Sequence, residues 1–346
     1  MTESIKKFQD HVAHVRKRPG MYFGTGGPPA VLRGIREVLN SIVGLAPRDY
    51  AGPITLSLKK NGEIAIHFPN LLIHAFAPET VNAWIGMFWR ERRLCNVAFL
   101  AAYSDKFIIE SGDARTQAVW RFSDDGVETK CGGRRTLPHL RFTFRPIDDY
   151  GRGLTDDHAY QLGAMLKDLS ALRPGLSTRL SVARWPHEVR YYYAQGLRSL
   201  LFEEDFARYS LHPECIEFKG EKAGMRVEGF LRFVHAGNPL VRNWVNLHPT
   251  QGGAHLTGFG KALTKIFPDA KGGCRTARFI TNSNTGAMVK IPHSFIGALV
   301  LETEDPRYEG PTRDILLGDE IKDFVREVAL QQIPPQWKKL REAKIL

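Results

Sequence analysis

Glu37 is the first residue of this chain whose type and setting could do chemistry. It lies within Val31–Val43, where apolar residues repeat at helical spacing and predict an amphipathic helix with Glu37 on its other face. Ser41 follows one turn later, so that a carboxylate and a hydroxyl share one face. A lone glutamate on a helix is usually a solvated surface residue, so this pair alone does not identify a reaction.

The cysteines indicate neither metal nor redox chemistry. They are widely separated, without the paired spacing of zinc or thiol–disulfide sites: Cys95, Cys131, Cys215 and Cys274. The first residues lack the apolar segment of a secretory signal, and no apolar run approaches the roughly 18–20 residues that cross a bilayer. We therefore expect a cytoplasmic protein with free thiols and no membrane partner.

The charge balance is the second feature that bears on function. The 346 residues carry a formal net charge of +11, and the 43% hydrophobic and 25% charged content is that of a globular protein. A field of this sign attracts polyanions, of which nucleic acid is the commonest in a cytoplasm. The alternative is a basic surface that only keeps the protein in solution, and charge alone does not decide between them.

The first two hundred residues predict strands with helices to one side. Ile54–Leu58 and Ile64–Phe68 alternate around Asn61-Gly62, a hairpin signal. Further strands are predicted at Lys106–Glu110, Ala118–Phe122, Leu140–Arg145 and Thr178–Val182, and a second helix at Asp156–Leu172. This pattern is typical of an α+β fold.

The remainder of the chain predicts a second set of strands and helices. Strands are predicted at Val227–Val234, Val241–Leu247 and Ser294–Glu302, and helices at Gly258–Phe267 and Asp319–Gln332. The segment Lys219–Gly224 is small, charged and poor in apolar residues, as linkers are. We therefore predict two domains, residues 1–215 and 216–346.

Three separated segments carry a family resemblance. The first is Arg16–Gly24, with Glu37 downstream, and its signature residues are Arg18, Pro19, Gly20 and Tyr22. The second is Gln251–Phe259, with Gly252, Gly253 and His255, and the third is Asp305–Arg313. In this order they resemble the ATPase subunits of gyrase B and topoisomerase IV, of the GHKL ATPase group.

The resemblance implies a fold and a mechanism. The implied fold is a GHKL-type (Bergerat) α/β sandwich followed by a transducer domain of ribosomal-protein-S5-like fold. In the family, ATP drives two such fragments to dimerise into a clamp around duplex DNA. DNA is therefore an expected partner, together with a second copy of the chain or a gyrase B-type subunit. The segments that follow in the family include a Toprim domain for DNA cleavage, and nothing in these residues resembles it.

Some site residues carry over from the family by position. Glu37 occupies the place of the general base that activates the attacking water. Ser41 falls on the magnesium asparagine, with Asn40 beside it, and Arg313 falls on the lysine that contacts the γ-phosphate, after Thr312. Gly252, Gly253 and His255 are expected to define a turn and a helix start.

Other positions depart from the family pattern. The adenine-binding aspartate should follow the strand at Ile64–His67, where the chain reads Phe68–Ile73 without a carboxylate. The glycine-rich phosphate loop aligns with Glu91–Asn96, which contains no glycine, so side chains would block close backbone approach to phosphate. Together these losses would remove most of the roughly 8 kcal/mol of a micromolar site. We therefore expect no cofactor, or ATP and magnesium if the site still functions.

Three functions remain open at this point. The first is a non-catalytic gyrase B-like module, a pseudo-ATPase with a vestigial Glu37 that dimerises and associates with DNA or a topoisomerase. The alternative is an active ATP-hydrolysing subunit of a type II DNA topoisomerase with rewired site residues. The third is a regulator that pairs with a genuine gyrase B as a heterodimer.

Overall fold

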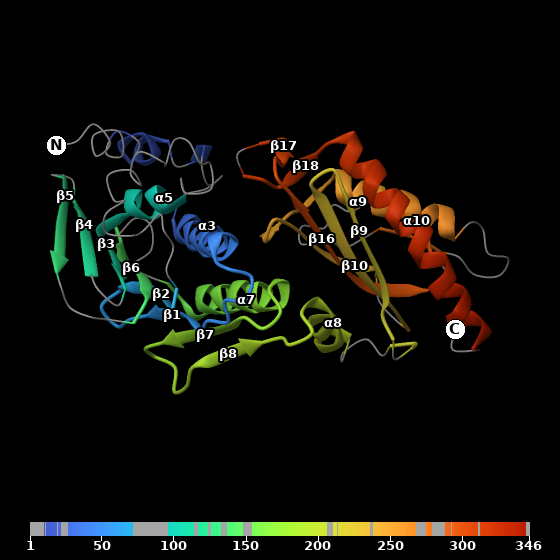
Figure 1. Ribbon diagram of the computed structural model, residues 1–346, viewed down its shortest axis with the longest axis horizontal. Helices are drawn as coiled ribbons and strands as arrows, with labels where there is room; N and C mark the ends of the chain where they lie inside the picture. The colour runs from blue at the N-terminus through green and yellow to red at the C-terminus, as the bar shows by residue number, and fades with distance from the viewer. Residues whose placement is uncertain are drawn as a thin grey trace. The chain divides into compact units, whose positions relative to one another are not determined.

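The computed structural model describes two compact units, Met1–Ala194 and Gln195–Leu346, and each is considered by itself (Figure 1). The residues whose structure is described are 10, 12–18, 20–21, 27–71, 96–113, 117–123, 126–132, 137–147, 154–205, 210–212, 214–235, 238–267, 275–278, 288–291, 293–310 and 312–343.

Unit 1 is built on one mixed sheet of eight strands, which run in the order β5-β4-β3-β6-β2-β1-β7-β8. The strands are β1 (Ile54–Leu58), β2 (Ile64–Pro69), β3 (Ser104–Gly112), β4 (Gln117–Ser123), β5 (Gly126–Gly132), β6 (His139–Pro146), β7 (Ser177–Val182) and β8 (Val189–Tyr192). β1 pairs antiparallel with β2, which confirms the predicted hairpin, and parallel with β7.

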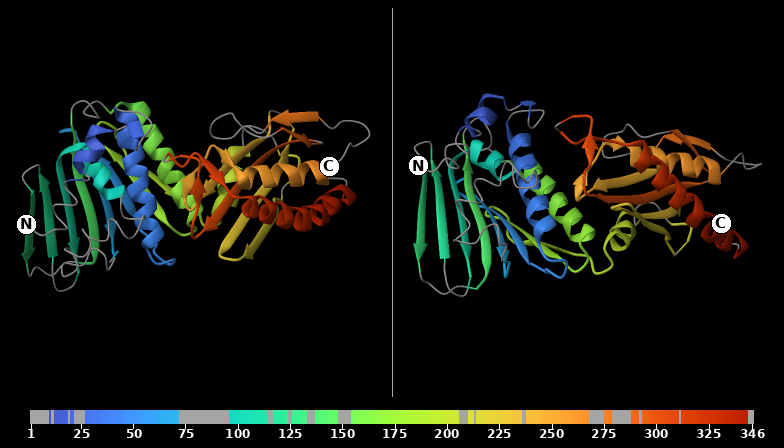
Figure 2. Two further views of the ribbon diagram at one scale, coloured as in Figure 1. Left: turned by 90° about the horizontal axis from the view of Figure 1, so that it is seen from above. Right: turned by 45° about the horizontal axis from the view of Figure 1, so that its top comes forward.

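Helices cover one face of this sheet. They are α3 (Pro28–Leu45), α5 (Asn96–Ala102) and α7 (Asp156–Leu172). α7 packs on β7 and β8, α5 on β3 and β6, and α3 on both other helices, as the views in Figure 2 show. The buried residues of β1, β6 and β7 alternate with partly exposed ones, so these strands have one covered face and one open face.

The helix predicted around Glu37 is α3, and its sequence explains where it begins and how closely it packs. Pro28 and Pro29 lie in its first turn, where a missing amide hydrogen costs nothing, and Gly27 before them has a φ of 72°. Gly34 faces α5, since a Cβ there would lie 2.8 Å from Leu100 Cδ2. The absence of a side chain at this position lets the two helices approach.

Unit 2 contains a five-stranded sheet in the order β12-β11-β16-β10-β9 and two smaller sheets, β13-β18-β17 and β14-β15. Its strands are β9 (Ile216–Lys222), β10 (Met225–Val234), β11 (Leu240–Val245), β12 (His248–Pro249), β13 (Gly252–Gly253), β14 (Arg275–Arg278), β15 (Met288–Ile291), β16 (Ser294–Thr303), β17 (Arg307–Tyr308) and β18 (Ile315–Leu317). Its helices are α8 (Leu197–Asp205), α9 (Ala254–Ile266) and α10 (Asp319–Glu342).

The core of unit 2 lies between the large sheet and helices α9 and α10. Phe218, Phe233, Phe259 and Phe295 are each at most 1% exposed there. α9 and α10 approach at Gly258, where a Cβ would lie 2.2 Å from the carbonyl oxygen of Lys322. Burial of these large side chains supplies the main stabilisation of the unit.

The division between the units differs from the predicted boundary at residue 215. The segment Lys219–Gly224, which reads as a linker, is the end of β9 and the turn of the β9–β10 hairpin. Ala223 and Gly224 both have positive φ, 50° and 74°, as a two-residue hairpin turn requires. The division falls instead after Ala194, because α8 packs on β10 and β16 of unit 2.

Both edge strands of the unit 1 sheet and the length of helix α10 were not predicted. β8 has only four residues, and β5 reads Gly-Val-Glu-Thr-Lys-Cys-Gly, so neither shows a clear alternation of apolar residues. α10 continues ten residues beyond the predicted end at Gln332 to Glu342, although Pro334 and Pro335 lie inside it. Proline usually ends a helix, so the sequence signal at this point is misleading.

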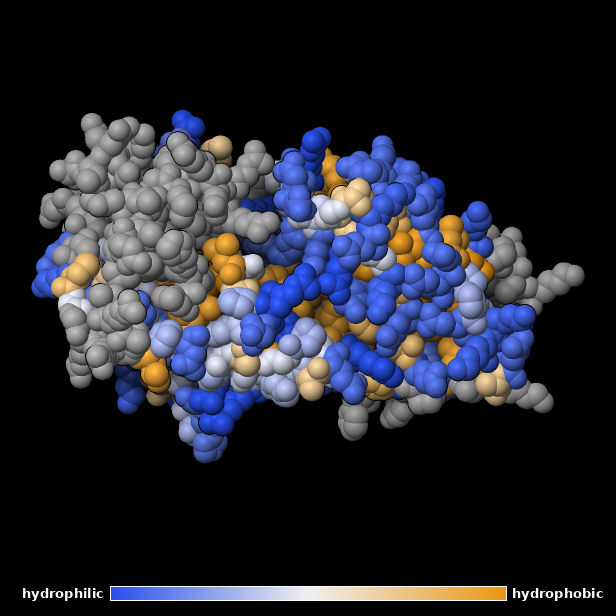
Figure 3. Space-filling view, viewed as in Figure 1, coloured by the Kyte–Doolittle hydropathy of each residue, from blue (hydrophilic) through white to orange (hydrophobic). Residues whose placement is uncertain are grey.

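The described surface of unit 2 is mainly hydrophilic on the face in Figure 3, with apolar side chains visible between the polar ones. Among the described residues, no helix is long and apolar enough to cross a membrane.

Candidate functional site

The candidate catalytic residues of unit 1 lie together on α3. Glu37 and Asn40 are 7% exposed and Ser41 is 9% exposed, and each of the three has an interaction partner. Residues three and four positions apart share a helix face, so Glu37 is a neighbour of both others. The structure contradicts the view of Glu37 as a solvated surface residue. A carboxylate this deeply buried is uncommon outside paired or functional settings.

The first signature segment lies against α5 and β3. Residues 12–17 are helical, and Arg16 donates through Nε to the carbonyl oxygen of Ala102 at 2.8 Å. Val15 is fully buried beside Ala102 and Tyr103. Arg18 and Gly20 are exposed, whereas Pro19 and Tyr22 lie outside the described residues. Arg16 and Val15 therefore hold this segment to the sheet, and Arg18 remains accessible.

The position expected for adenine recognition is mainly apolar. β2 ends at Phe68-Pro69, Asn70 follows with a φ of 55°, and Leu71 is 2% exposed. His67 precedes them, and burial, with Arg141 and His139 nearby, lowers its pKa to about 4. No carboxylate lies on this stretch. The expected phosphate loop at 91–95 lies outside the described residues, and Asn96 begins α5.

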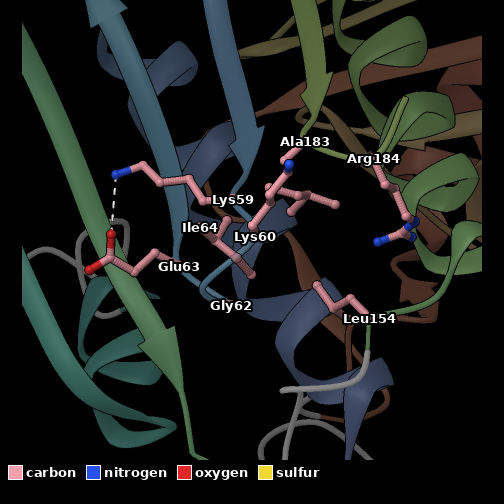
Figure 4. A pocket seen from close by; sticks show the side chains of 9 residues that line it. Lys59, Lys60, Gly62, Glu63, Ile64, Leu154, Ala183 and Arg184 are labelled. Carbon is pink, nitrogen blue, oxygen red and sulfur yellow. Dashed lines mark hydrogen bonds and ion pairs between the residues drawn. The ribbon is translucent and has the colours of Figure 1, made fainter. Parts of the chain in front are cut away.

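A pocket of about 400 Å³ lies at the opposite end of β2 from this position. Figure 4 shows Lys59 and Glu63 on one side of it and Arg184 on the other. The hydrogen bond from Lys106, and then those from Asn61 and Lys59, lower the pKa of Glu63 to about 2. Lys59 binds Glu63 at 3.1 Å and Arg184 binds Asp156 at 2.6 Å, so these charges are already paired, and Lys60 also lines the pocket.

The other two signature segments lie side by side in unit 2. β13 pairs in parallel with β18, Gly252 opposite Ile315 and Gly253 opposite Leu316. The amides of Gln251 and Gly252 both donate to the carbonyl oxygen of Asp314. Gly253 has a φ of 129°, and a Cβ there would lie 2.4 Å from the backbone of Leu316. The expected turn at Gly252-Gly253 is thus a short strand that leads directly into α9.

Arg313 ends a tight turn held by this small sheet. β17 pairs with β18, the amide of Glu309 donates to the carbonyl oxygen of Ile315, and the amide of Arg313 donates to that of Gly310. Arg313 has a φ of 58°, an uncommon conformation for a residue with a side chain. Its Nη1 lies 3.2 Å from His248 Nε2. Such strain is often found where a side chain must be aimed, and Thr312 precedes it in the same turn.

His255 belongs to a buried polar network rather than to an open site. Its Nε2 lies 3.0 Å from Asn243 Oδ1 and 3.2 Å from Thr250 Oγ1, and Thr250 also donates to Asn243. All three side chains are at most 1% exposed. Burial lowers the pKa of His255 to about 3, so the ring is neutral near pH 7. Asn243, Thr250 and His248 could not be identified as partners from the sequence, because they belong to no motif.

The described residues contain no group of three or more histidine, cysteine or acidic side chains that could hold a metal ion. Cys131 is an exposed free thiol and Cys215 a partly buried one. Cys95 and Cys274 lie outside the described residues.

Sequence comparison finds known proteins that are similar to this chain. The model of the family described as DNA gyrase B matches residues 196–339. The type 2 topoisomerase B-subunit of Aquifex aeolicus is 22% identical over 98% of this chain and 45% of its own length. The DNA gyrase B-subunit of Archaeoglobus fulgidus is 24% identical over 91% of this chain and 53% of its own length. The chain thus spans about half the length of these relatives.

Solved structures share the fold of the whole chain. The B-subunit of the DNA gyrase from Myxococcus xanthus superposes with a TM-score of 0.78 at 20% identity, over 97% of this chain and 99% of its own. The 43K ATPase domain of Thermus thermophilus gyrase B, in complex with an aminocoumarin, gives 0.70 at 19% identity, over 98% and 92%. The predicted fold, a GHKL-type α/β unit followed by a transducer-like unit, is confirmed.

Proposed function

We propose that this chain, which is similar to the N-terminal half of gyrase B, is a non-catalytic module of the type II topoisomerase system. It keeps the ATPase and transducer scaffold, associates with DNA or with a topoisomerase subunit, and dimerises without depending on ATP hydrolysis. The proposal extends a fold likeness to a role and rests on the residues at the expected nucleotide site.

The observation that carries the proposal is the end of β2. In the family a carboxylate reads the purine amino group, whereas here the chain supplies Phe68, Pro69 and a buried Leu71 around an exposed Asn70, whose amide oxygen is the only side-chain acceptor of Phe68–Leu71. An unpaired polar edge of the base against such residues costs about 1–3 kcal/mol. The sequence Glu91–Asn96 adds a second obstacle, since it has no glycine where backbone amides would hold phosphates.

A second candidate function follows from α3 and the turn at Arg313. Glu37 is buried together with Ser41, as a general base beside a magnesium ligand would be. Arg313 keeps a positive charge in a strained turn. These features favour an active ATPase subunit of a type II topoisomerase, in which ATP and magnesium bind a rewired site.

Calorimetry with a non-hydrolysable ATP analogue and magnesium separates the two functions. For the non-catalytic module we expect no saturable binding below about 1 mM, which corresponds to about −4 kcal/mol. A micromolar dissociation constant would reject the proposal. An ATP-binding gyrase B fragment, titrated under the same conditions, is the positive control.

Phosphate release provides an independent test with a matched variant. The non-catalytic module predicts equal, background release by the wild type and Glu37→Ala. Release by the wild type that disappears in Glu37→Ala would establish the active ATPase instead.

A further inference from the structure

A row of side chains that includes three arginines and one lysine crosses the open face of the unit 1 sheet. The strand registers place one residue from each of the eight strands directly beside the next. From edge to edge this cationic row consists of Arg190, Arg179, Thr55, His67, Arg141, Glu110, Val119 and Lys130. Directly opposed residues point to one face of a sheet, so the row forms a continuous line.

Most acidic groups beside the row are already neutralised. Glu63 is paired with Lys59 and Lys106, and Asp105 with Arg145, whereas Glu128 and Glu188 are paired with the two ends of the row, Lys130 and Arg190. Among the described residues of the row, Glu110 is the carboxylate that these pairs leave unneutralised.

Arg141 and Arg179 remain as unneutralised cations. Among the described residues, neither makes an ion pair, and the Nε of Arg179 has no hydrogen-bond partner. Glu110 lies opposite Arg141 in the register but forms no ion pair with it there. His67, opposite Arg141 on β2, adds no negative charge, and positive charge on Arg141 and His139 helps to keep its ring neutral.

The distribution of charge along the chain agrees with this location. Residues 1–194 contain 27 lysines and arginines against 19 acidic residues, whereas residues 195–346 contain 21 against 18. Unit 1 therefore carries +8 of the formal net charge of +11. A polyanion would be drawn to unit 1 more strongly than to unit 2.

We propose that the open face of the unit 1 sheet, through the cationic row, binds the phosphate backbone of duplex DNA. Neighbouring strands lie about 4.8 Å apart, so Arg179 and Arg141, three strands apart, are separated by about 14 Å, and the whole row spans about 33 Å. A line of this length on a twisted sheet can contact several phosphates without reading bases. The inference rests on the DNA association in the proposed function and specifies its surface.

The test is binding of a fluorescent 20-base-pair duplex, measured by anisotropy over a range of salt concentrations. The variant Arg141→Gln with Arg179→Gln should bind about tenfold more weakly at 0.1 M salt. Its slope of log affinity against log salt should fall by about 1.8, since each lost phosphate contact removes about 0.9. Lys222→Gln with Lys338→Gln, two exposed residues of unit 2, removes the same charge and should change affinity much less.

A second variant changes only exposed residues of the row, so that weaker binding can be separated from misfolding of the first variant. Arg190→Gln with Lys130→Gln removes the exposed ends of the row, whose side chains are 66% and 64% exposed, and should also weaken binding and lower the slope. If both row variants bind as the wild type does, or if the unit 2 variant loses as much affinity, the proposed surface is wrong.

Two further outcomes show whether the DNA association or only the proposed surface is wrong. If the wild type binds no duplex at all, the DNA association in the proposed function fails as well. If it binds anionic lipid vesicles through the row but no duplex, the surface is an anion site for another partner and the inference is overturned.

Discussion

Gln336 and Glu217 exchange two hydrogen bonds between helix α10 and the edge strand β9. The side-chain Nε2 of Gln336 donates to the carbonyl oxygen of Glu217 at 2.6 Å, and its Oε1 accepts from the amide of Glu217 at 3.1 Å. Gln332, one turn earlier, forms the same two bonds with Lys219. Two glutamine amides thus take the place of a neighbouring strand along an otherwise open sheet edge.

Removal of both amides should expose this edge. We expect Gln332→Ala with Gln336→Ala to destabilise unit 2 by about 1–2 kcal/mol, since partly exposed hydrogen bonds contribute little each. The Tm should fall by about 2–8 °C for a unit of this size. Sedimentation velocity should also show self-association that increases with concentration, because β9 could then pair with a second copy.

Gln331→Ala is the matched control, since Gln331 is exposed on the same helix. It should leave both the Tm and the sedimentation coefficient unchanged. A double variant that melts and sediments like the wild type would show that β9 needs no cover.

The network around His255 should make unit 2 sensitive to acid. The pKa of His255 is about 3 in the folded chain, against an ordinary value of 6.5, so the unfolded chain binds more protons between these values. The contribution of neutral His255 to the free energy of unfolding is fully present above pH 6.5. It is lost as pH falls towards 3, by about 1.4 kcal/mol per pH unit. Urea unfolding of the wild type and His255→Gln from pH 7 to 4 measures it. The variant should be less stable at pH 7 and should lack this part of the slope, and equal slopes would contradict the assignment.

Gly253 and Gly252 offer a direct test of the β13–β18 contact. Gly253→Ala places a methyl group 2.4 Å from Leu316 backbone atoms at a φ of 129°, so we expect a loss of about 2 kcal/mol or more. Gly252→Ala, with no atom within 4 Å of its Cβ, should change the Tm by little. Equal melting of the two variants would argue against this contact.

The β9–β10 turn should accept a stabilising substitution. Ala223 has a φ of 50°, which asparagine tolerates better than alanine, and Gly224 follows. Ala223→Asn should stabilise unit 2 by about 0.5 kcal/mol, and Gly224→Ala should destabilise it, as measured by chemical unfolding. A lower stability of Ala223→Asn would exclude this turn conformation.

Long periodic segments could be predicted from the sequence because the apolar pattern alone determines them. α7 has the predicted bounds, Asp156–Leu172, and the β1–β2 hairpin forms around Asn61-Gly62. β9 could not be predicted, because its outward residues are charged and its edge is satisfied by side chains of α10 from over a hundred residues away.

The candidate site was predictable only in part. The helix position of Glu37 followed from periodicity, but its burial depends on neighbours that no local pattern identifies. The cationic row was likewise hidden, because its members are single residues on eight strands that only the register brings together.

Pro334 and Pro335 remove two of the backbone hydrogen bonds that would join the last two turns of α10 to the turn before them. A proline nitrogen carries no hydrogen, so the carbonyl groups of Leu330 and Gln331 receive no amide from the following turn. Side-chain contacts hold the far end of the helix in place. Gln336 donates to the carbonyl oxygen of Glu217 on β9, and the ring of Trp337 lies 4.7 Å from that of Phe233 and 5.0 Å from that of Phe267. The tip of the helix therefore depends on these side-chain contacts, more than on hydrogen bonds to the preceding turn, for its place against the core.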